Sequence, residues 1–254
     1  MWFILYTVGF VASVLYVYSF FRRRLFASFM EHITSKPSPK ITAMKKSLFE
    51  SMKEIVSSDP ESKRSGRFRL LEIGPGTGTN FEFYPSNAKL SVLEPDHSFK
   101  DYFARNKQKF PHLELENFYE GWAQDMKQVR SGSIDAVVCT RVLCSVPVRK
   151  TGPFLAEVKR VLAPKGRFYF VEHVGDRPGT ILRWIQNALR ATFLYGFLTC
   201  GCIPNKSTDE DVKRAGFSST DATRFHVETD APVWTLKGFF LRLIASHVAG
   251  VAGK

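Results

Sequence analysis

The chain has 254 residues and a formal net charge of +12, from 36 basic and 24 acidic residues. That length suits one catalytic domain with a short appendage. The positive charge would suit a nucleic acid or an anionic membrane, but the basic residues are scattered and no zinc-knuckle or RNA-reading motif accompanies them, so nucleic acid is an unlikely partner.

Residues 2–21 carry no charge and are mostly large apolar or aromatic. Twenty helical residues at about 1.5 Å each cover about 30 Å, the thickness of a bilayer's hydrocarbon core. Arg22, Arg23 and Arg24 follow directly and predict a cytosolic C-terminal side. We therefore expect residues 1–24 to be a membrane anchor that contacts lipid through residues 2–21. A cleaved signal peptide fits less well, because no basic segment precedes the apolar run; a segment lying in one leaflet stays open.

Residues 25–66 are expected to form a juxtamembrane segment that ends in an amphipathic helix. Beyond the prolines at 37 and 39, apolar side chains recur every three or four residues, at Ile41, Met44, Leu48, Met52 and Ile55. The helix could pack on the catalytic domain, or it could cover the active site and accept substrate from the membrane. The pattern is compatible with both.

Strand and helix patterns alternate through residues 67–254, which predicts an α/β domain with a Rossmann-like sheet and helices on both faces. Ligands of such sheets bind at the carboxyl ends of the strands. Helices are expected at 98–109 and 149–162, and a further one ends at Gly216. Strands are expected at 68–73, 89–93, 112–118, 134–140, 167–173, 220–227 and 239–248. That makes seven strands, with the last pair antiparallel.

The first expected strand ends on Gly74, Gly76 and Gly78. Glycine has no Cβ and tolerates positive φ, so the backbone can pass close to a ligand there. The second strand ends at Glu94, whose carboxylate could accept both hydroxyls of a ribose. The loop is not Gly-x-Gly-x-x-Gly, and the absence of a following Gly-Lys-Ser/Thr excludes a P-loop. These residues predict a nucleoside site.

Residues 72–78 with the apolar residues before them resemble motif one of the class I S-adenosylmethionine-dependent methyltransferases. Glu94 stands at that family's ribose-binding acid, and residues 121–126 fall where the family contacts adenine. Residues 131–146 resemble motif four, and residues 162–166 the turn before strand five. The resemblance implies S-adenosylmethionine as cofactor, bound by Glu72, Gly74, Pro75, Gly76, Thr77, Gly78, Asn80, Glu94, Pro95, Ala123, Gln124, Thr140 and Arg141.

Residues 70–85, 139–146 and 168–174 are similar to the membrane-anchored methyltransferase-like seven group, thiol S-methyltransferases of the endoplasmic reticulum and lipid droplets. The chain departs from that group at Pro75, where cysteine is common, and at Glu94, where the group has aspartate. Glutamate keeps the charge and both oxygens, so cofactor binding should survive. The resemblance implies methyl transfer to the sulfur of small or lipophilic alkyl thiols, with the catalytic domain facing the cytosol and no obligate protein partner.

An alkyl thiol is largely protonated at neutral pH, so a base or a cation could promote its reaction. His173 is the candidate catalytic base, because it ends the fifth strand on the ligand side of the sheet. A histidine that only hydrogen-bonds or packs is the alternative. Glu172 is a second candidate, although strand alternation would turn it away from the ligand.

Four cysteines are too few for a disulfide framework in a domain of this size, which predicts a reduced, cytosol-facing protein. Cys139 and Cys144 are expected to be buried thiols. Cys200 and Cys202 lack the partner pair of a zinc site, so no metal is expected.

Residues 181–198 are strongly apolar and are interrupted by Arg183 and Arg190. They could form a core helix, or a lid or membrane-dipping helix that admits lipophilic substrates. Two other functions stay open for the chain as a whole. One is methyl transfer to a quinone, a lipid carbon or an RNA base. The other is a membrane or lipid-droplet protein that binds the cofactor and has weak activity.

Overall fold

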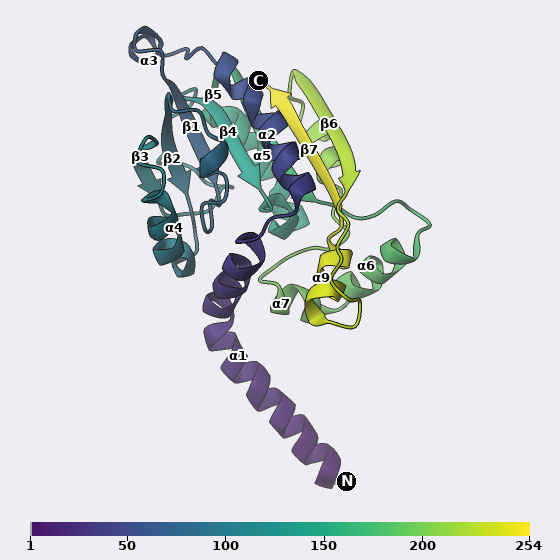
Figure 1. Cartoon of the computed structure of the whole chain (residues 1–254). Helices are drawn as coiled ribbons and strands as arrows, with labels where there is room; N and C mark the ends of the chain where they lie inside the picture. The colour runs from purple at the N-terminus through teal and green to yellow at the C-terminus, as the bar shows by residue number, and fades with distance from the viewer. Residues whose placement is uncertain (1) are drawn as a thin grey trace.

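A seven-stranded sheet forms the centre of the molecule, in the order β3-β2-β1-β4-β5-β7-β6 (Figure 1). In this computed structural model, residues 2–254 are described, except for the side chains of residues 2–5, 8 and 236. The strands are β1 (Phe68–Ile73), β2 (Ala88–Leu93), β3 (Glu114–Tyr119), β4 (Ile134–Thr140), β5 (Leu162–His173), β6 (Ser219–His226) and β7 (Ser246–Gly253). β1 to β5 pair in parallel, and β7 runs antiparallel to both β5 and β6. The predicted seven-stranded sheet and its antiparallel last pair are confirmed.

Helices cover both faces of this sheet. The α-helices of the described residues are α1 (Trp2–Thr34), α2 (Pro39–Glu50), α3 (Pro60–Arg64), α4 (Lys100–Lys107), α5 (Val148–Val161), α6 (Ile181–Ala191), α7 (Phe193–Leu198), α8 (Thr208–Arg214) and α9 (Leu236–Leu243). The helices expected near 98–109 and 149–162 are therefore α4 and α5. The helix expected to end at Gly216 is α8, and Gly216 follows it with a φ of 69°.

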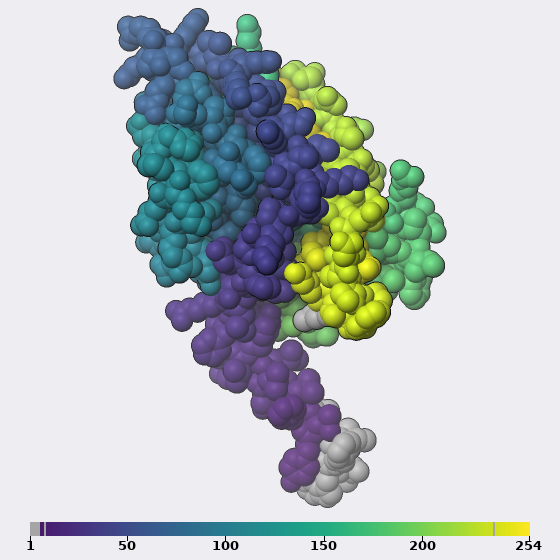
Figure 2. Space-filling model, in the orientation of Figure 1, coloured from purple at the N-terminus to yellow at the C-terminus, as the bar shows by residue number. Residues whose placement is uncertain are grey.

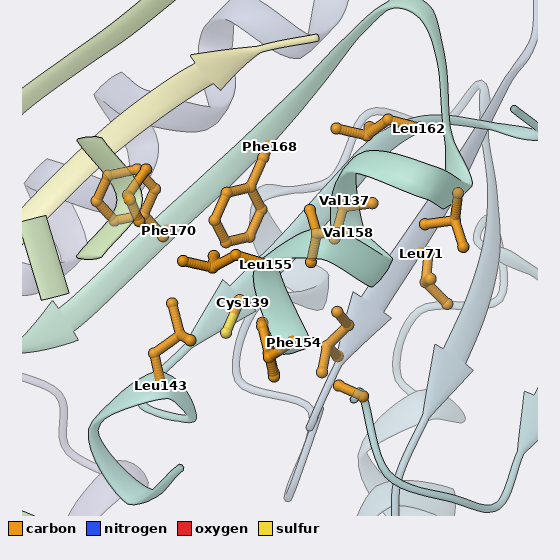
Figure 3. Packing of buried hydrophobic residues seen from close by; sticks show 14 of the residues in the cluster. Leu71, Val137, Cys139, Leu143, Phe154, Leu155, Val158, Leu162, Phe168 and Phe170 are labelled. Carbon is orange, nitrogen blue, oxygen red and sulfur yellow. The ribbon is translucent and has the colours of Figure 1, made fainter. Parts of the chain in front are cut away.

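Two hydrophobic clusters lie on opposite faces of the sheet, because side chains alternate along each strand. On β1, Leu71 and Ile73 face one cluster, whereas Phe68 and Leu70 face the other. The first cluster packs under α5 and is drawn in Figure 3. The second packs under α2 and α4. Burial on both faces explains why the central strands are almost uniformly apolar.

The strand expected at 239–248 is wrong in its first half, where the chain forms α9; β7 begins only at Ser246. The Thr235 side chain caps this helix by accepting a hydrogen bond from the Gly238 amide. The residues of α9 form a short apolar run, and periodicity alone cannot show whether such a run is a strand or a helix. The cap supplies the information that the apolar pattern lacks.

Residues 181–198 form two helices, α6 and α7, which break at Thr192. Their largest apolar side chains are exposed rather than buried: Ile181, Trp184 and Phe193 are each more than 70% exposed. The segment is therefore buried on one face only, where Leu182, Ile185 and Leu189 pack against a small cluster of Tyr195, Cys202 and Leu243. α6 and α7 instead lie at the same end of the sheet as α1 and α9 (Figure 1).

α1 continues without a break past the three arginines and projects from the body of the molecule (Figure 2). Its described outer part exposes Tyr6, Phe10, Val11, Val14, Tyr16, Val17, Phe20, Phe21 and Leu25. Within the described part of the chain, no helix is both long and apolar enough to cross a membrane. The anchor expected at 2–21, part of which falls on undescribed side chains, stays a prediction, as do the boundaries 1–24, 25–66 and 67–254.

Candidate active site

A cavity of about 1550 Å³ opens where β1, β2 and β4 end. Its walls come from the loops after these strands, from the inner half of α1, from the start of α2 and from α7. Ordinary small-molecule sites have volumes of about 300–1,000 Å³. The cavity is therefore large enough for two small molecules side by side.

The glycine loop, residues 74–78, forms the floor of this cavity. All three glycines have positive φ, 63° at Gly74, 53° at Gly76 and 78° at Gly78. A Cβ on Gly74 would lie 2.5 Å from Val142 Cγ2, and one on Gly78 would overlap the Phe81 ring. Side chains are excluded at both positions, so the cavity meets bare backbone here.

Glu94 follows β2, lines the cavity and is hydrogen-bonded to the glycine loop. Its Oε2 accepts a hydrogen bond from the Gly76 amide (3.1 Å), and its Oε1 accepts one from the Asp96 amide (3.0 Å). The side chain is 92% buried, and burial raises the pKa of its carboxyl to about 7 against the effect of these hydrogen bonds. Each carboxylate oxygen can accept a second hydrogen bond, so hydroxyls of a ligand in the cavity can also bind Glu94.

Glu72, Asn80 and Thr140 form a network beneath the loop. The Asn80 side-chain amide donates to Glu72 Oε1 (2.6 Å) and to Thr140 Oγ1 (2.9 Å). Thr140 lines the cavity, whereas Glu72 and Asn80 lie behind its wall. Burial raises the pKa of the Glu72 carboxyl to about 7. Glu72 and Asn80 therefore position the loop rather than reach into the cavity.

The other residues expected at a cofactor all line the cavity: Pro75, Thr77, Pro95, Ala123, Gln124 and Arg141. Arg141 has a φ of 58°, which is uncommon for a residue other than glycine, and its amide donates to Val171 O at 2.9 Å. This conformation turns the chain sharply after β4. The turn leaves Arg141 in the wall that the strand ends form.

The two residues considered as bases, His173 and Glu172, do not line the cavity. His173 Nε2 lies 2.9 Å from Cys202 Sγ, and its ring is 97% buried. Glu172 accepts the amides of Val142, Leu143 and Cys144 at 3.0–3.1 Å. Glu172 therefore fixes the turn after β4. The base role of His173 stays a prediction, and this placement gives it no support.

His247, at the start of β7, is a cavity residue that the sequence did not reveal. It is the register partner of His173 and is 98% buried. Its Nδ1 lies 3.0 Å from Ala245 O, a group that only accepts, so Nδ1 carries the proton. Nε2 has no hydrogen-bond partner among the described residues. Burial, assisted by the charge of Arg141, lowers the pKa of His247 to about 3, which leaves a neutral ring with a free acceptor.

Lys45 on α2 also lines the cavity, although it was not predicted there from the sequence. Its side chain is 91% buried, and Nζ lies 3.4 Å from Thr79 Oγ1. Burial and the nearby charge of Arg141 lower the pKa of Lys45 to about 7. A sequence signal does exist, because Lys45 stands four residues after Ile41 on the apolar face of the helix. The ammonium group of a lysine on a buried helix face must reach polar partners or a cavity, so such a lysine indicates a nearby polar site.

Known proteins resemble this chain in sequence and in fold. A family profile described as "Methyltransferase domain" matches residues 71–170. The chain is 35% identical to the thiol S-methyltransferase TMT1B of Mus musculus over 76% of its own length and 75% of the relative's. It is 32% identical to the thiol S-methyltransferase TMT1A of Homo sapiens, over 94% and 89% of the two chains.

Solved methyltransferase structures share the fold. A putative methyltransferase of Bacillus halodurans superposes with a TM-score of 0.54 at 14% identity, covering 82% of this chain and 98% of that one. A S-adenosylmethionine-dependent methyltransferase of Thermotoga maritima gives a TM-score of 0.56 at 12% identity, covering 94% and 99%. At these identities the likeness concerns the fold alone.

The cavity fits S-adenosylmethionine, the cofactor of this enzyme class. The glycine loop lets a ligand approach the backbone without meeting a side chain at Gly74 or Gly78, and Glu94 offers free acceptor positions beside it. The chain is a S-adenosylmethionine-dependent methyltransferase. It belongs to the thiol S-methyltransferase TMT1 family, within the class I methyltransferases.

Proposed function

We propose that this chain transfers the methyl group of S-adenosylmethionine to the sulfur of small or lipophilic alkyl thiols. The observation that carries the proposal is the two-sided character of one cavity. One side consists of the glycine loop and Glu94, and the other side carries a group of apolar side chains among charged ones. The apolar side is lined by Phe26, Met30, Ile33, Phe197, Leu241 and Ile244. The relatives named thiol S-methyltransferase support sulfur as the acceptor.

The donor side holds the cofactor through groups that this chain supplies. Glu94 would accept the ribose hydroxyls, and the loop backbone would lie along the amino-acid portion. Gln124 would lie against the adenine, and Thr140 with Arg141 would face the methionine side. When bound, S-adenosylmethionine supplies an activated methyl group on a positively charged sulfur. A thiolate and that cation neutralise each other as the methyl moves, so a dry, aligned cavity favours the reaction.

The acceptor side would orient the thiol through His247. Its Nε2 has no partner among the described residues but is buried in the cavity wall, so it would accept a hydrogen bond from an S–H group once the wall moves aside; its neutral state leaves that lone pair available at physiological pH. Arg141 also lines the cavity and its charge acts on His247. A cation there would favour the thiolate over the thiol. His247 would align the sulfur, and Arg141 would promote its ionisation; the thiol proton would pass to solvent, because a histidine with a pKa of about 3 cannot hold it.

We further propose that the chain sits on the endoplasmic reticulum membrane or lipid droplets, through residues 2–21, with its catalytic domain in the cytosol. The exposed apolar side chains of α1 support this, because they form an unusually long apolar surface. α7 extends that surface: Tyr18 Oη donates to Leu198 O at 2.9 Å, and the Arg22 guanidinium lies over the Phe197 ring at 5.1 Å. Arg22 and Phe197 also line the cavity, which would open toward the lipid.

An acceptor panel tests the activity. Full-length protein receives labelled S-adenosylmethionine with a small thiol, a lipophilic thiol, a quinone precursor or RNA. The proposal expects labelled thioether from the thiols, with the lipophilic thiol preferred. Labelled quinone precursor or labelled RNA, without labelled thioether, would show that the acceptor is not a thiol. Cofactor binding without any transfer would favour a lipid-droplet binding protein.

Flotation with phosphatidylcholine vesicles tests the membrane surface. The wild-type chain should float with the vesicles, and removal of residues 2–21 should release it. The double variant Ile181→Ser with Trp184→Ser should weaken binding if α6 touches lipid. A matched double change on an exposed polar face, Lys213→Ser with Arg214→Ser, is the control. Equal flotation of the truncated and full chains would contradict the anchor.

A further inference from the structure

Three side chains from distant parts of the chain converge just behind the cavity wall. Cys144 lies in the 3-10 turn Leu143–Ser145 after β4, His173 ends β5, and Cys202 lies in the loop after α7. One ligand atom of each lies within 4.8 Å of the other two. His173 Nε2 and Cys202 Sγ are 2.9 Å apart. All three residues are more than 90% buried.

Ordinary packing does not account for this cluster. All four cysteines of the chain are free, so Cys144 and Cys202 are not a disulfide. Thiols are weak hydrogen-bond partners, and His173 Nδ1 has no partner among the described residues. Burying an imidazole against two thiols therefore costs desolvation free energy that weak hydrogen bonds do not offset. A small apolar cluster would fill the same space at lower cost.

The separations match those between the ligands of a tetrahedral zinc ion. With Zn–S of about 2.3 Å and Zn–N of about 2.0 Å, two sulfurs lie about 3.8 Å apart and a sulfur and a nitrogen about 3.5 Å apart. The observed contact of 2.9 Å and the limit of 4.8 Å lie on either side of these values. Shifts of less than about 1 Å would give the coordination geometry.

We propose that Cys144 Sγ, His173 Nε2 and Cys202 Sγ bind a Zn²⁺ ion. Two thiolates and an imidazole prefer zinc to the oxygen-seeking cations Mg²⁺ and Ca²⁺. Binding releases two thiol protons, so the dication with two thiolates adds no net charge to a buried site. Tyr195 Oη, 3.6 Å from Cys202 Sγ, can donate a hydrogen bond to that thiolate and stabilise it.

The neighbouring residues support a fixed site. Glu172 accepts the Cys144 amide at 3.1 Å, and Ile203 N donates to Cys144 O at 2.9 Å. These bonds hold the two cysteine-bearing segments in register before any ion binds. Cys200 and Gly201, next to Cys202, line the cavity. The ion would therefore fasten the loop after α7 as part of the active-site wall.

Metal titration of the full chain tests the site directly. Purified protein in mild detergent is reduced, transferred to metal-free buffer and titrated with Co²⁺, then with Zn²⁺. The proposal expects one equivalent of Co²⁺, tetrahedral visible bands, a sulfur-to-cobalt charge-transfer band, and displacement by Zn²⁺. Cys144→Ser and Cys202→Ser should lose the charge-transfer band. Cys200→Ser, two residues from Cys202, should keep it.

His173→Cys separates a ligand from a packing residue. This variant offers three thiolates, so it should keep the metal and strengthen the charge-transfer band, whereas His173→Ala should lose metal. Circular dichroism and cofactor binding identify variants that do not fold. The proposal is overturned if the reduced wild-type chain, with four titratable thiols, binds no cobalt above a blank. It is also overturned if folded Cys144→Ser and Cys202→Ser match the wild type. Neither result bears on thiol methylation, because the readout is the metal.

Discussion

Glu94 and Gly76 are joined by a hydrogen bond of 3.1 Å, from the Gly76 amide to Glu94 Oε2. The bond ties the end of β2 to the loop after β1. One carboxylate therefore holds the glycine loop and faces the cofactor cavity at the same time. Replacing this side chain should affect binding twice, through the lost ribose acceptor and through the loosened loop.

Glu94→Ala should weaken S-adenosylmethionine binding strongly. Hydrogen bonds to a charged group contribute about 1.5–3 kcal/mol, which corresponds to a Kd raised about 10- to 150-fold. Isothermal titration calorimetry measures the change. Glu120→Gln, on an exposed neighbouring loop, is the control and should bind as the wild type does. An unchanged affinity in Glu94→Ala would remove Glu94 from the cofactor site.

Cofactor affinity should rise with pH between about 6 and 8. Burial raises the pKa of Glu94 to about 7. Only the ionised carboxylate can accept hydrogen bonds from the ribose hydroxyls at both oxygens, because a bound proton occupies one acceptor position. Glu72 and Lys45 titrate near the same pH, so Glu94→Gln is needed to isolate the Glu94 contribution. The slope of log Kd against pH should flatten in that variant. An identical slope in both proteins would contradict the assignment.

The same carboxyl should make the cofactor-free protein less stable as pH rises. The folded pKa of Glu94 is raised above its ordinary value of about 4.5, so the folded state binds more protons than the unfolded state between about 4.5 and 7. Its contribution to the free energy of unfolding is therefore full below about 4.5 and is lost as pH passes about 7. Urea unfolding of wild type and Glu94→Gln across this range should diverge with that sign.

Gly78→Ala should destabilise the protein more than Gly132→Ala. Both residues have positive φ, 78° and 66°, so both substitutions carry a backbone penalty of about 1–2 kcal/mol. Only at Gly78 would the new Cβ also overlap a neighbouring side chain, the Phe81 ring, since Gly132 has open space. Overpacking adds about 1–3 kcal/mol. Urea unfolding compares the two, and equal losses would show that the loop can move aside.

His247→Gln should lower kcat/KM for a thiol about tenfold or more, while the Kd of the cofactor changes less than about twofold. Glutamine cannot reproduce a ring nitrogen fixed by the Ala245 carbonyl. His226→Gln, on the neighbouring strand β6 and exposed, is the control. A full loss of cofactor binding, or unaltered thiol kinetics, would exclude the orienting role.

Local patterns predicted most of the fold. β1 and β4 begin and end at the predicted residues, because buried strands bounded by turns have a clear signature. The glycine loop was also readable, since three alternate glycines indicate positive φ. The segment 239–248 was misjudged, because the cap at Thr235 and the approach of α9 to α1 decide its structure. The Phe29–Phe240 ring contact at 5.5 Å is one such tertiary contact.

Side-chain direction could not be predicted to the same degree. The sequence indicated that His173 ends a strand at the ligand edge, and it does. Whether the ring reaches the cavity depends on the segment packed against it, here the loop that carries Cys202. His247 reaches the cavity from a strand that arrives antiparallel, late in the chain. Neither its register with His173 nor the meeting of Cys144 with Cys202 is encoded in a local spacing.

The central claim is that sulfur accepts the methyl group in this cavity. The most direct measurement gives the full-length protein labelled S-adenosylmethionine and a lipophilic alkyl thiol, beside the matching alcohol, and identifies the products. The account predicts labelled methyl thioether from the thiol, none from the alcohol, and loss of the product in Glu94→Ala. Cofactor binding without any labelled thioether, or equal methylation of the alcohol, would contradict it.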